Sequence, residues 1–190
     1  MAGPHLPLIS IEEFLDAEEL AETKHMYYAG VVTAMAGGTF EHAQIAMNLG
    51  GQLYGLLRER GCAVVGSDVM FQTGSKEMVT YPDLMVVCGP VERAPGRQTV
   101  ITNPVFLVEV LSPSTEARDR GVKSHEYRLS PTLQQYALIC QDRPLVEIHT
   151  RCADGSWRIT EVMGLAADCA FSSLACSMPM AALYEGVLAG

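Results

Sequence analysis

The clearest pattern of apolar and polar positions lies over residues 39–61 and predicts a long helix. Thr39 is a residue type that caps helix N-termini, and the pattern stops at Gly61, a common helix terminator. Between them, apolar side chains recur at helical spacing and would form one buried face: Ile45, Leu49, Leu53, Leu56 and Leu57.

Capping signals predict two more helices. Ser10 and Glu13 have the spacing of a capping box, which predicts a short acidic helix over residues 11–22. The turn at residues 112–115 carries hydroxyl side chains that can cap a helix over residues 116–129. A proline follows this second helix and stops it.

Short runs of β-branched and apolar residues predict strands. Residues 26–28 and 31–35 lie on either side of Gly30 and predict a leading hairpin, which ends at a Gly37-Gly38 break. Two runs are apolar almost throughout, as in central strands covered on both faces: residues 84–88 and 105–111. The other predicted strands cover residues 62–65, 69–72, 135–140, 145–149 and 157–162.

The order of these elements predicts the fold class. We expect an α/β fold with a mixed β-sheet flanked by helices, preceded by an N-terminal helix and a β-hairpin. Residues 89–104 are rich in proline and glycine and predict a long loop or arm. No repeat or linker divides the chain, so we expect one domain over residues 1–190.

Composition and charge limit the classes of function. Hydrophobic residues make up 48% of the chain and charged residues 18%, so the chain can bury a core. Thirteen Lys and Arg against 22 Asp and Glu give a net charge of −9. This sign opposes bulk attraction to nucleic acid, so a polyanionic partner needs a local site.

The cysteines and the N-terminal residues bear on cellular location. The six cysteines form no C-x-x-C pair, and we expect reduced thiols. The opening MAGPHLPLIS has no charged segment before a long apolar stretch, and no 18-residue apolar run occurs in the chain. We therefore expect a cytoplasmic protein without a membrane partner.

Common motifs of other enzyme classes are missing. The sequence has no G-x-S-x-G, P-loop or G-x-G-x-x-G motif, and its histidines lack the spacing of zinc ligands. His42, near the start of the long helix, is interpreted first as a helix-terminal histidine with a satisfied hydrogen bond, and a metal-facing role is the alternative. The adjacent Glu41 has no assigned role.

Two acidic residues are associated with the apolar strands. Glu109 lies inside the 105–111 run, where burial of a lone carboxylate is costly, so it is a candidate site residue. The alternative is an edge-strand glutamate that faces water. Asp83 precedes the 84–88 run, and a turn aspartate is the alternative there. Adjacent strands could let both carboxylates share one divalent ion, and hard oxygen ligands favour Mg²⁺ or Mn²⁺.

Lys123 is the candidate cation of this site. It lies in the helix that follows the Glu109 strand, and this helix could fold back toward the same pocket. There its ammonium would stabilise charge that develops on a phosphate. The alternative is a solvated lysine on a helix surface.

Three segments resemble a known family. They are Tyr81-Pro82-Asp83-Leu84, then Val108-Glu109-Val110-Leu111-Ser112-Pro113-Ser114-Thr115, then Asp119 through Lys123 to Tyr127. Their order and spacing resemble the Uma-type putative restriction endonuclease family of the PD-(D/E)xK nuclease superfamily. The resemblance covers nearly the whole chain and implies a restriction-endonuclease-like fold.

The resemblance also implies roles for single residues. Asp83 and Glu109 are similar to the metal-binding acids of the family, and the carbonyl of Val110 is implied as a third ligand. Lys123 matches the relocated lysine of the Uma-type proteins, because Leu111 stands where the superfamily's E-x-K pattern has lysine.

Two residues of the last segment match the same family motif. Asp119 and Tyr127 each lie four residues from Lys123, so a regular helix would place all three on one face. Asp119 would then hold and orient the ammonium of the lysine, and Tyr127 would pack beneath it.

Two classes of function remain in competition. The leading hypothesis is a Mg²⁺-dependent DNA endonuclease with Asp83, Glu109 and Lys123 as catalytic residues and, by resemblance, 5′-phosphate products and a homodimer. The alternative is a non-catalytic dimerising or DNA-associated module on the same fold; a hydrolase of other phosphate esters is a third possibility. A local arginine track would offset the negative net charge: Arg93, Arg97, Arg118 and Arg120.

Overall fold

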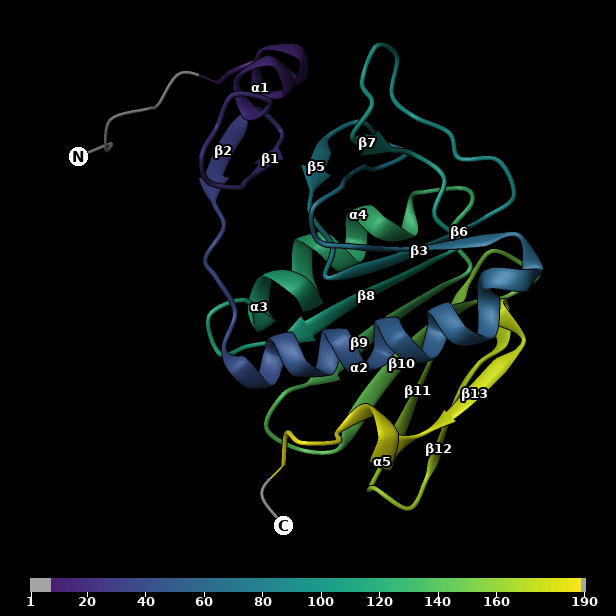
Figure 1. Ribbon diagram of the computed structural model, residues 1–190. Coiled ribbons are helices and arrows are strands. Elements are labelled where there is room, and N and C mark those ends of the chain that lie inside the picture. Colours follow the sequence, from purple (N-terminus) through teal and green to yellow (C-terminus); the bar gives the residue numbers. More distant parts are fainter. Residues whose placement is uncertain (1–7, 189–190) are drawn as a thin grey trace.

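The computed structural model describes residues 8–188, and its largest element is a six-stranded mixed sheet (Figure 1). In the order β11-β10-β9-β8-β6-β3, neighbours are antiparallel except for the parallel pair β8 and β9. The strands are β3 (Cys62–Gly66), β6 (Leu84–Cys88), β8 (Phe106–Leu111), β9 (Gln135–Cys140), β10 (Leu145–Arg151) and β11 (Trp157–Met163). Every strand predicted for these positions is confirmed, with bounds that differ by one or two residues at most. The first seven residues, on which the expectation of no export partly depends, lie outside the described residues.

A second sheet of five strands lies over one face of the first, in the order β2-β1-β5-β4-β7 (Figure 1). The turn between β1 and β2 has positive φ at both Ala29 (47°) and Gly30 (87°), which suits a tight hairpin, so the predicted hairpin is confirmed. The strands are β1 (His25–Tyr28), β2 (Val31–Ala34), β4 (Met70–Gln72), β5 (Met78–Thr80) and β7 (Val100–Ile101). The sequence did not predict β5 or β7, and β7 lies inside the 89–104 loop.

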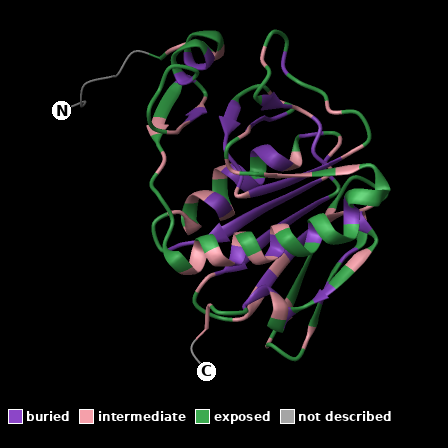
Figure 2. Cartoon of the chain, in the orientation of Figure 1, coloured by how far each residue is buried: buried purple, intermediate pink, exposed green. Residues whose placement is uncertain are grey.

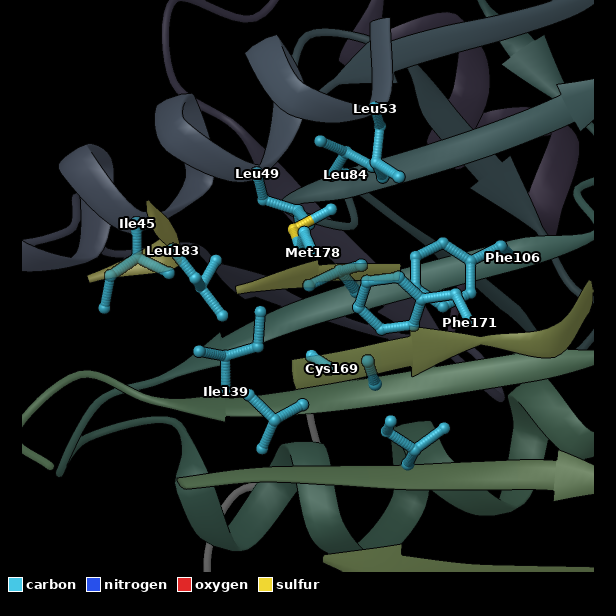
Figure 3. Packing of buried hydrophobic residues seen from close by; sticks show 14 of the residues in the cluster. Ile45, Leu49, Leu53, Leu84, Phe106, Ile139, Cys169, Phe171, Met178 and Leu183 are labelled. Atoms are coloured by element: carbon cyan, nitrogen blue, oxygen red, sulfur yellow. The ribbon is translucent and has the colours of Figure 1, made fainter. Parts of the chain in front are cut away.

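The helix α2 (Phe40–Leu57) covers the other face of the six-stranded sheet. The Thr39 hydroxyl accepts a hydrogen bond from the His42 amide, as predicted for an N-cap, and a 3₁₀ turn η1 (Arg58–Arg60) follows the helix. The apolar face of α2 packs with strand residues such as Leu84, Phe106 and Ile139 (Figure 3). None of the helices within residues 8–188 has the length and apolarity to span a bilayer.

The N-terminal helix packs against the five-stranded sheet, and the C-terminal elements pack against α2 and the six-stranded sheet. The capping box of Ser10 and Glu13 is present at α1 (Ile11–Glu18), although this helix ends four residues earlier than predicted. The C-terminal elements pack beside α2 and were not predicted: β12 (Asp168–Phe171), η3 (Ser172–Leu174), β13 (Cys176–Pro179) and α5 (Met180–Leu183).

The helix predicted over residues 116–129 is interrupted. It consists of α3 (Glu116–Arg118), a π-helical segment η2 (Asp119–Lys123) and α4 (Ser124–Arg128). The interruption centres on Gly121, whose φ of −93° and ψ of −105° are not helical. The chain is therefore helical over the predicted residues, but as two helices joined across a kink rather than as one regular helix.

The expectation that all cysteines are reduced is also wrong. Strands β3 and β6 pair so that Cys62 lies opposite Cys88, and their sulfurs form a disulfide. The four cysteines at positions 140, 152, 169 and 176 are free. The two cysteines are 26 residues apart in the sequence, and this spacing did not predict a disulfide. The register of the two strands brings them together.

Candidate active site

The register of β6 and β8 brings Asp83 and Glu109 together. Leu84 pairs with Val108 in this antiparallel ladder, so the next residues out, Asp83 and Glu109, lie opposite each other and face the same side. Strand β8 lies between β6 and β9 in the sheet. Both β8 and β9 are buried along their length (Figure 2). Glu109 is only 2% exposed, which rules out the alternative of a water-facing glutamate on an edge strand.

The carboxylate of Asp83 is held at the end of this ladder. Its Oδ2 accepts a hydrogen bond of 2.7 Å from the backbone N–H of Val110, the residue after Glu109. The same oxygen lies 3.1 Å from Nε2 of His42, which reaches it from α2. Asp83 is therefore a fixed part of the site rather than a free turn residue, and both contacts fall on Oδ2.

Lys123 and Tyr127 contact the Glu109 carboxylate. The Lys123 Nζ lies 3.0 Å from Oε1 of Glu109 and 3.0 Å from Oδ1 of Asp119. The Tyr127 hydroxyl donates a hydrogen bond of 2.5 Å to the same Oε1. Lys123 is 4% exposed, so the alternative of a solvated helix lysine is wrong. Despite the break at Gly121, Lys123 and Tyr127 both contact Glu109, and Asp119 contacts Lys123.

The buried charges shift the pKa values of both partners. Burial raises the pKa of Glu109 to about 8, with the charge of Lys123 opposing the shift and those of Asp83 and Asp119 adding to it. Burial lowers the pKa of Lys123, but the charges of Glu109 and Asp119 outweigh it and raise that pKa above its usual value. Lys123 is therefore an ammonium at neutral pH.

His42 faces this site, as the metal-facing alternative for it supposed. Burial lowers the pKa of its imidazole, but contact with the Asp83 carboxylate, the charge of Asp119 and the Val110 backbone together raise it. The adjacent Glu41 does not belong to the described residues that line the cleft at this site. The sequence signal for His42 was its place in the first turn of α2, which was interpreted first as that of a helix-terminal histidine with a satisfied hydrogen bond.

The candidate residues open into one cleft of about 740 Å³, a size typical of ligand sites. Asp83, Glu109, Val110 and Lys123 line it, so the four residues assigned to the site by sequence share one space. The cleft also has wall residues that the sequence analysis did not single out for it: Thr23, Lys24, Met35, Met47, Tyr54 and Tyr81. Met47 and Tyr54 lie on α2, and the other four lie in the segments before β1, after β2 and after β5, so no spacing in the sequence linked the six.

The donors at the cleft fit a hard divalent ion. Asp83, Glu109 and Asp119 carry three negative charges when ionised, against one positive charge on Lys123, which leaves an excess of two. Within residues 8–188 no three His, Cys, Asp or Glu side chains gather as a ready metal site. Two of these carboxylates, Asp83 and Glu109, line the cleft together with Val110, and Mg²⁺ commonly binds through one or two carboxylates while it keeps several waters.

Half of the predicted arginine track is already paired with acidic side chains. Arg97 forms ion pairs with Asp16 and Glu19 near α1, at 2.5 and 3.1 Å. Arg120 pairs at 2.8 Å with both Glu116 and Glu147. Two of the four arginines are thus neutralised by neighbouring acids.

The chain is similar to a family model and to two proteins of Synechocystis sp. (strain ATCC 27184 / PCC 6803 / Kazusa). The model of the Uma2 family, described as "Putative restriction endonuclease", matches residues 11–176. "Uncharacterized protein slr1290" is 37% identical over 153 residues, or 80% of each chain. "Uncharacterized protein sll1609" is 32% identical over 165 residues, which cover 87% of this chain and 93% of its own length.

A solved structure shares the fold. It is a crystal structure from Anabaena variabilis ATCC 29413, described as "a putative nuclease belonging to DUF820", with a TM-score of 0.76 and 17% sequence identity. The match covers 93% of this chain and 97% of that chain. The predicted restriction-endonuclease-like α/β fold is therefore confirmed, and the family model with the two sequence relatives shows that the chain belongs to the Uma2 family.

Proposed function

We propose that this protein is a Mg²⁺-dependent or Mn²⁺-dependent endonuclease that hydrolyses phosphodiester bonds in DNA. The observation that carries the proposal is the pair of carboxylates on adjacent strands, Asp83 and Glu109, in a cleft where negative charge exceeds positive charge. Membership of the Uma2 family, described as "Putative restriction endonuclease", supports the same reaction class.

Each residue of the site has a part in this proposal. Asp83 and Glu109 would hold the ion with the Val110 carbonyl, and the ion would supply Lewis-acid polarisation and an acidified water. Lys123 would stabilise negative charge that develops on the phosphate, since its ammonium is at the cleft wall and stays protonated. Asp119 would keep that ammonium in place through its 3.0 Å ion pair.

A DNA substrate needs local charge compensation. The net charge of −9 opposes DNA, and two candidate arginines already pair with acids. A bound divalent ion would cancel the excess of two negative charges at the cleft and let a phosphate approach. We also propose, from the family resemblance, that the protein is a homodimer, which light scattering tests. The cytoplasmic location stays a prediction of the sequence, which cell fractionation tests.

Metal binding and cleavage can be measured on the same variants. Wild-type protein should bind Mn²⁺ in calorimetry and nick plasmid DNA with Mg²⁺ or Mn²⁺, and Asp83→Asn should lose both. Lys123→Ala should lower turnover while Mn²⁺ affinity stays nearly intact. Equal activity in Lys123→Ala would remove this lysine from the mechanism.

Two outcomes would support another function. A wild-type protein that binds no Mn²⁺ through Asp83 and Glu109 would favour the non-catalytic dimerising or DNA-associated module. Cleavage of nucleotides or small phosphodiesters without cleavage of plasmid DNA would favour a different phosphate-ester hydrolase.

A further inference from the structure

The contact between His42 and Asp83 is not explained by the roles assigned so far. The imidazole comes from the first turn of α2, a different element from either strand of the acid pair, and its Nε2 lies 3.1 Å from Asp83 Oδ2. The Val110 N–H binds the same oxygen from the other strand. Two contacts on one carboxylate oxygen restrict rotation of the group and leave Oδ1 for a ligand.

The glycine before α2 gives independent evidence that the imidazole position matters. Gly38 has no positive φ, so its backbone conformation does not call for glycine. A Cβ there would lie 2.7 Å from Nδ1 of His42, closer than real Cβ contacts, and 3.0 Å from its Cγ, so the imidazole would have to shift. A Cβ at the neighbouring Gly37 would meet nothing within 4 Å.

We propose that His42 is a positioning residue that fixes the Asp83 carboxylate, and that Gly38 leaves the space its imidazole needs. The effect of His42 on ion binding rests on the proposed function, whereas its effect on the orientation of the Asp83 carboxylate does not. Partners that orient a ligating carboxylate commonly change metal affinity by about 10–100-fold when they are removed. His42 should therefore act on the affinity of the site through Asp83.

The chain offers variants with matched controls. His42→Ala removes the contact, and His42→Gln keeps an N–H donor near the place of Nε2. Gly38→Ala displaces the ring without altering it, and its control Gly37→Ala adds the same methyl group in open space. Glu41→Ala is the control for His42→Ala, because it changes the adjacent residue outside the cleft wall. Thermal melting confirms that each variant is folded.

Two measurements test the proposal. The first is the NMR shift of the Val110 amide in metal-free protein, which reports its hydrogen bond to Asp83. The Val110 amide shift should change in His42→Ala and Gly38→Ala and should stay at its wild-type value in Gly37→Ala and Glu41→Ala. The second is Mn²⁺ affinity by calorimetry, which should fall about 10–100-fold in the same two variants and recover to within about fivefold of wild type in His42→Gln.

The outcomes separate this proposal from the proposed function. An unmoved Val110 amide in both His42→Ala and Gly38→Ala overturns the positioning role, whatever the protein binds. Unchanged Mn²⁺ affinity in these variants, with binding lost in Asp83→Asn, overturns the role of His42 and leaves the metal site standing. A wild-type protein without Mn²⁺ binding contradicts the proposed function, and the Val110 amide then decides on His42 alone. If His42→Ala does not fold, Gly38→Ala and His42→Gln carry the test.

Discussion

Glu109 and Glu126 are both buried glutamates, but their surroundings differ. Glu109 is 2% exposed, contacts Lys123 and Tyr127, and lines the cleft. Glu126 in α4 is 4% exposed and accepts hydrogen bonds from the hydroxyls of Ser75 (2.5 Å) and Thr73 (3.5 Å). It lies outside the cleft wall, and none of the ion pairs among residues 8–188 includes it.

The difference shows that burial of a carboxylate is not by itself a sign of a functional site. Hydroxyl donors satisfy Glu126 and tie the turn after β4 to α4, which is a structural use of a buried acid. Glu109 instead shares one ammonium with Asp119 and opens to a cleft with excess negative charge. A ligand in the cleft can reach Glu109, whereas Glu126 does not line the cleft.

The largest effect should come from removing the charge of Glu109. Glu109→Gln should lower metal-dependent DNA cleavage by more than about 10³-fold, because a lost ion removes several kcal/mol of transition-state stabilisation and each 1.36 kcal/mol is tenfold in rate. Glu126→Gln, the matched control, should cleave like wild type. Plasmid nicking measures both, and equal losses in the two variants would contradict the distinction drawn between these glutamates.

Removal of the Lys123 charge should destabilise the metal-free protein. Lys123→Met leaves the carboxylates of Glu109 and Asp119 buried without their cation, and loss of one partner of a buried pair typically costs about 3–5 kcal/mol. Because Mn²⁺ affinity should stay nearly intact without the lysine, Mn²⁺ should raise the free energy of unfolding of Lys123→Met and of wild type by about the same amount. Urea unfolding with and without Mn²⁺ measures both effects, and a metal-free Lys123→Met as stable as wild type would contradict the importance of the buried ion pairs.

Much of the fold could be predicted because apolar spacing survives in the long elements. Residues 84–88 and 135–140 form strands with the predicted bounds, and α2 begins at the predicted cap. The elements that were missed, β5, β7, β12 and β13, have two to four residues each, too few to establish a period. The break at Gly121 was missed because helical spacing of side chains continues across it.

The acids of the site could be predicted because a carboxylate stands out in an apolar strand, as Glu109 does in β8. Lys123 was a candidate because it lies in the helix after the Glu109 strand, and the family motif supported it, although no local pattern encodes the chain reversal that brings it to Glu109. His42 was interpreted first as a helix-terminal histidine, because its contact with Asp83 joins residues 41 positions apart and leaves no local pattern. The ion pairs of Arg97 with Asp16 and of Arg120 with Glu147 were equally hidden, since these partners lie far away in the sequence. The Glu116 partner of Arg120 lies at i, i+4 spacing.

Stability of the metal-free protein should depend on pH through Glu109. Burial raises its pKa to about 8 in the folded protein from a usual value near 4.5, so the folded state holds the proton more tightly than the unfolded state. This contribution is complete below about pH 4.5 and is lost as pH rises through about 8. The free energy of unfolding should therefore fall by on the order of a few kcal/mol over this window. Glu109→Gln should lack this component in urea titrations; an unchanged pH profile would contradict the assignment.

The smallest effect concerns the hydroxyls around Glu126 and tests the structural half of the comparison. Ser75→Ala removes the shorter of the two hydrogen bonds to this buried carboxylate and should lower the free energy of unfolding by about 1–3 kcal/mol, the cost of an unsatisfied buried group. Mn²⁺ affinity should stay within about twofold of wild type, a shift of under 1 kcal/mol by the usual conversion, because Ser75 does not line the cleft. Ser156→Ala, at an exposed turn where a serine hydroxyl likewise donates to a carboxylate, is the control and should change stability much less. A loss of Mn²⁺ affinity in Ser75→Ala would mean that the Glu126 cluster supports the metal site through α4, since Tyr127 follows Glu126 directly and donates to Glu109.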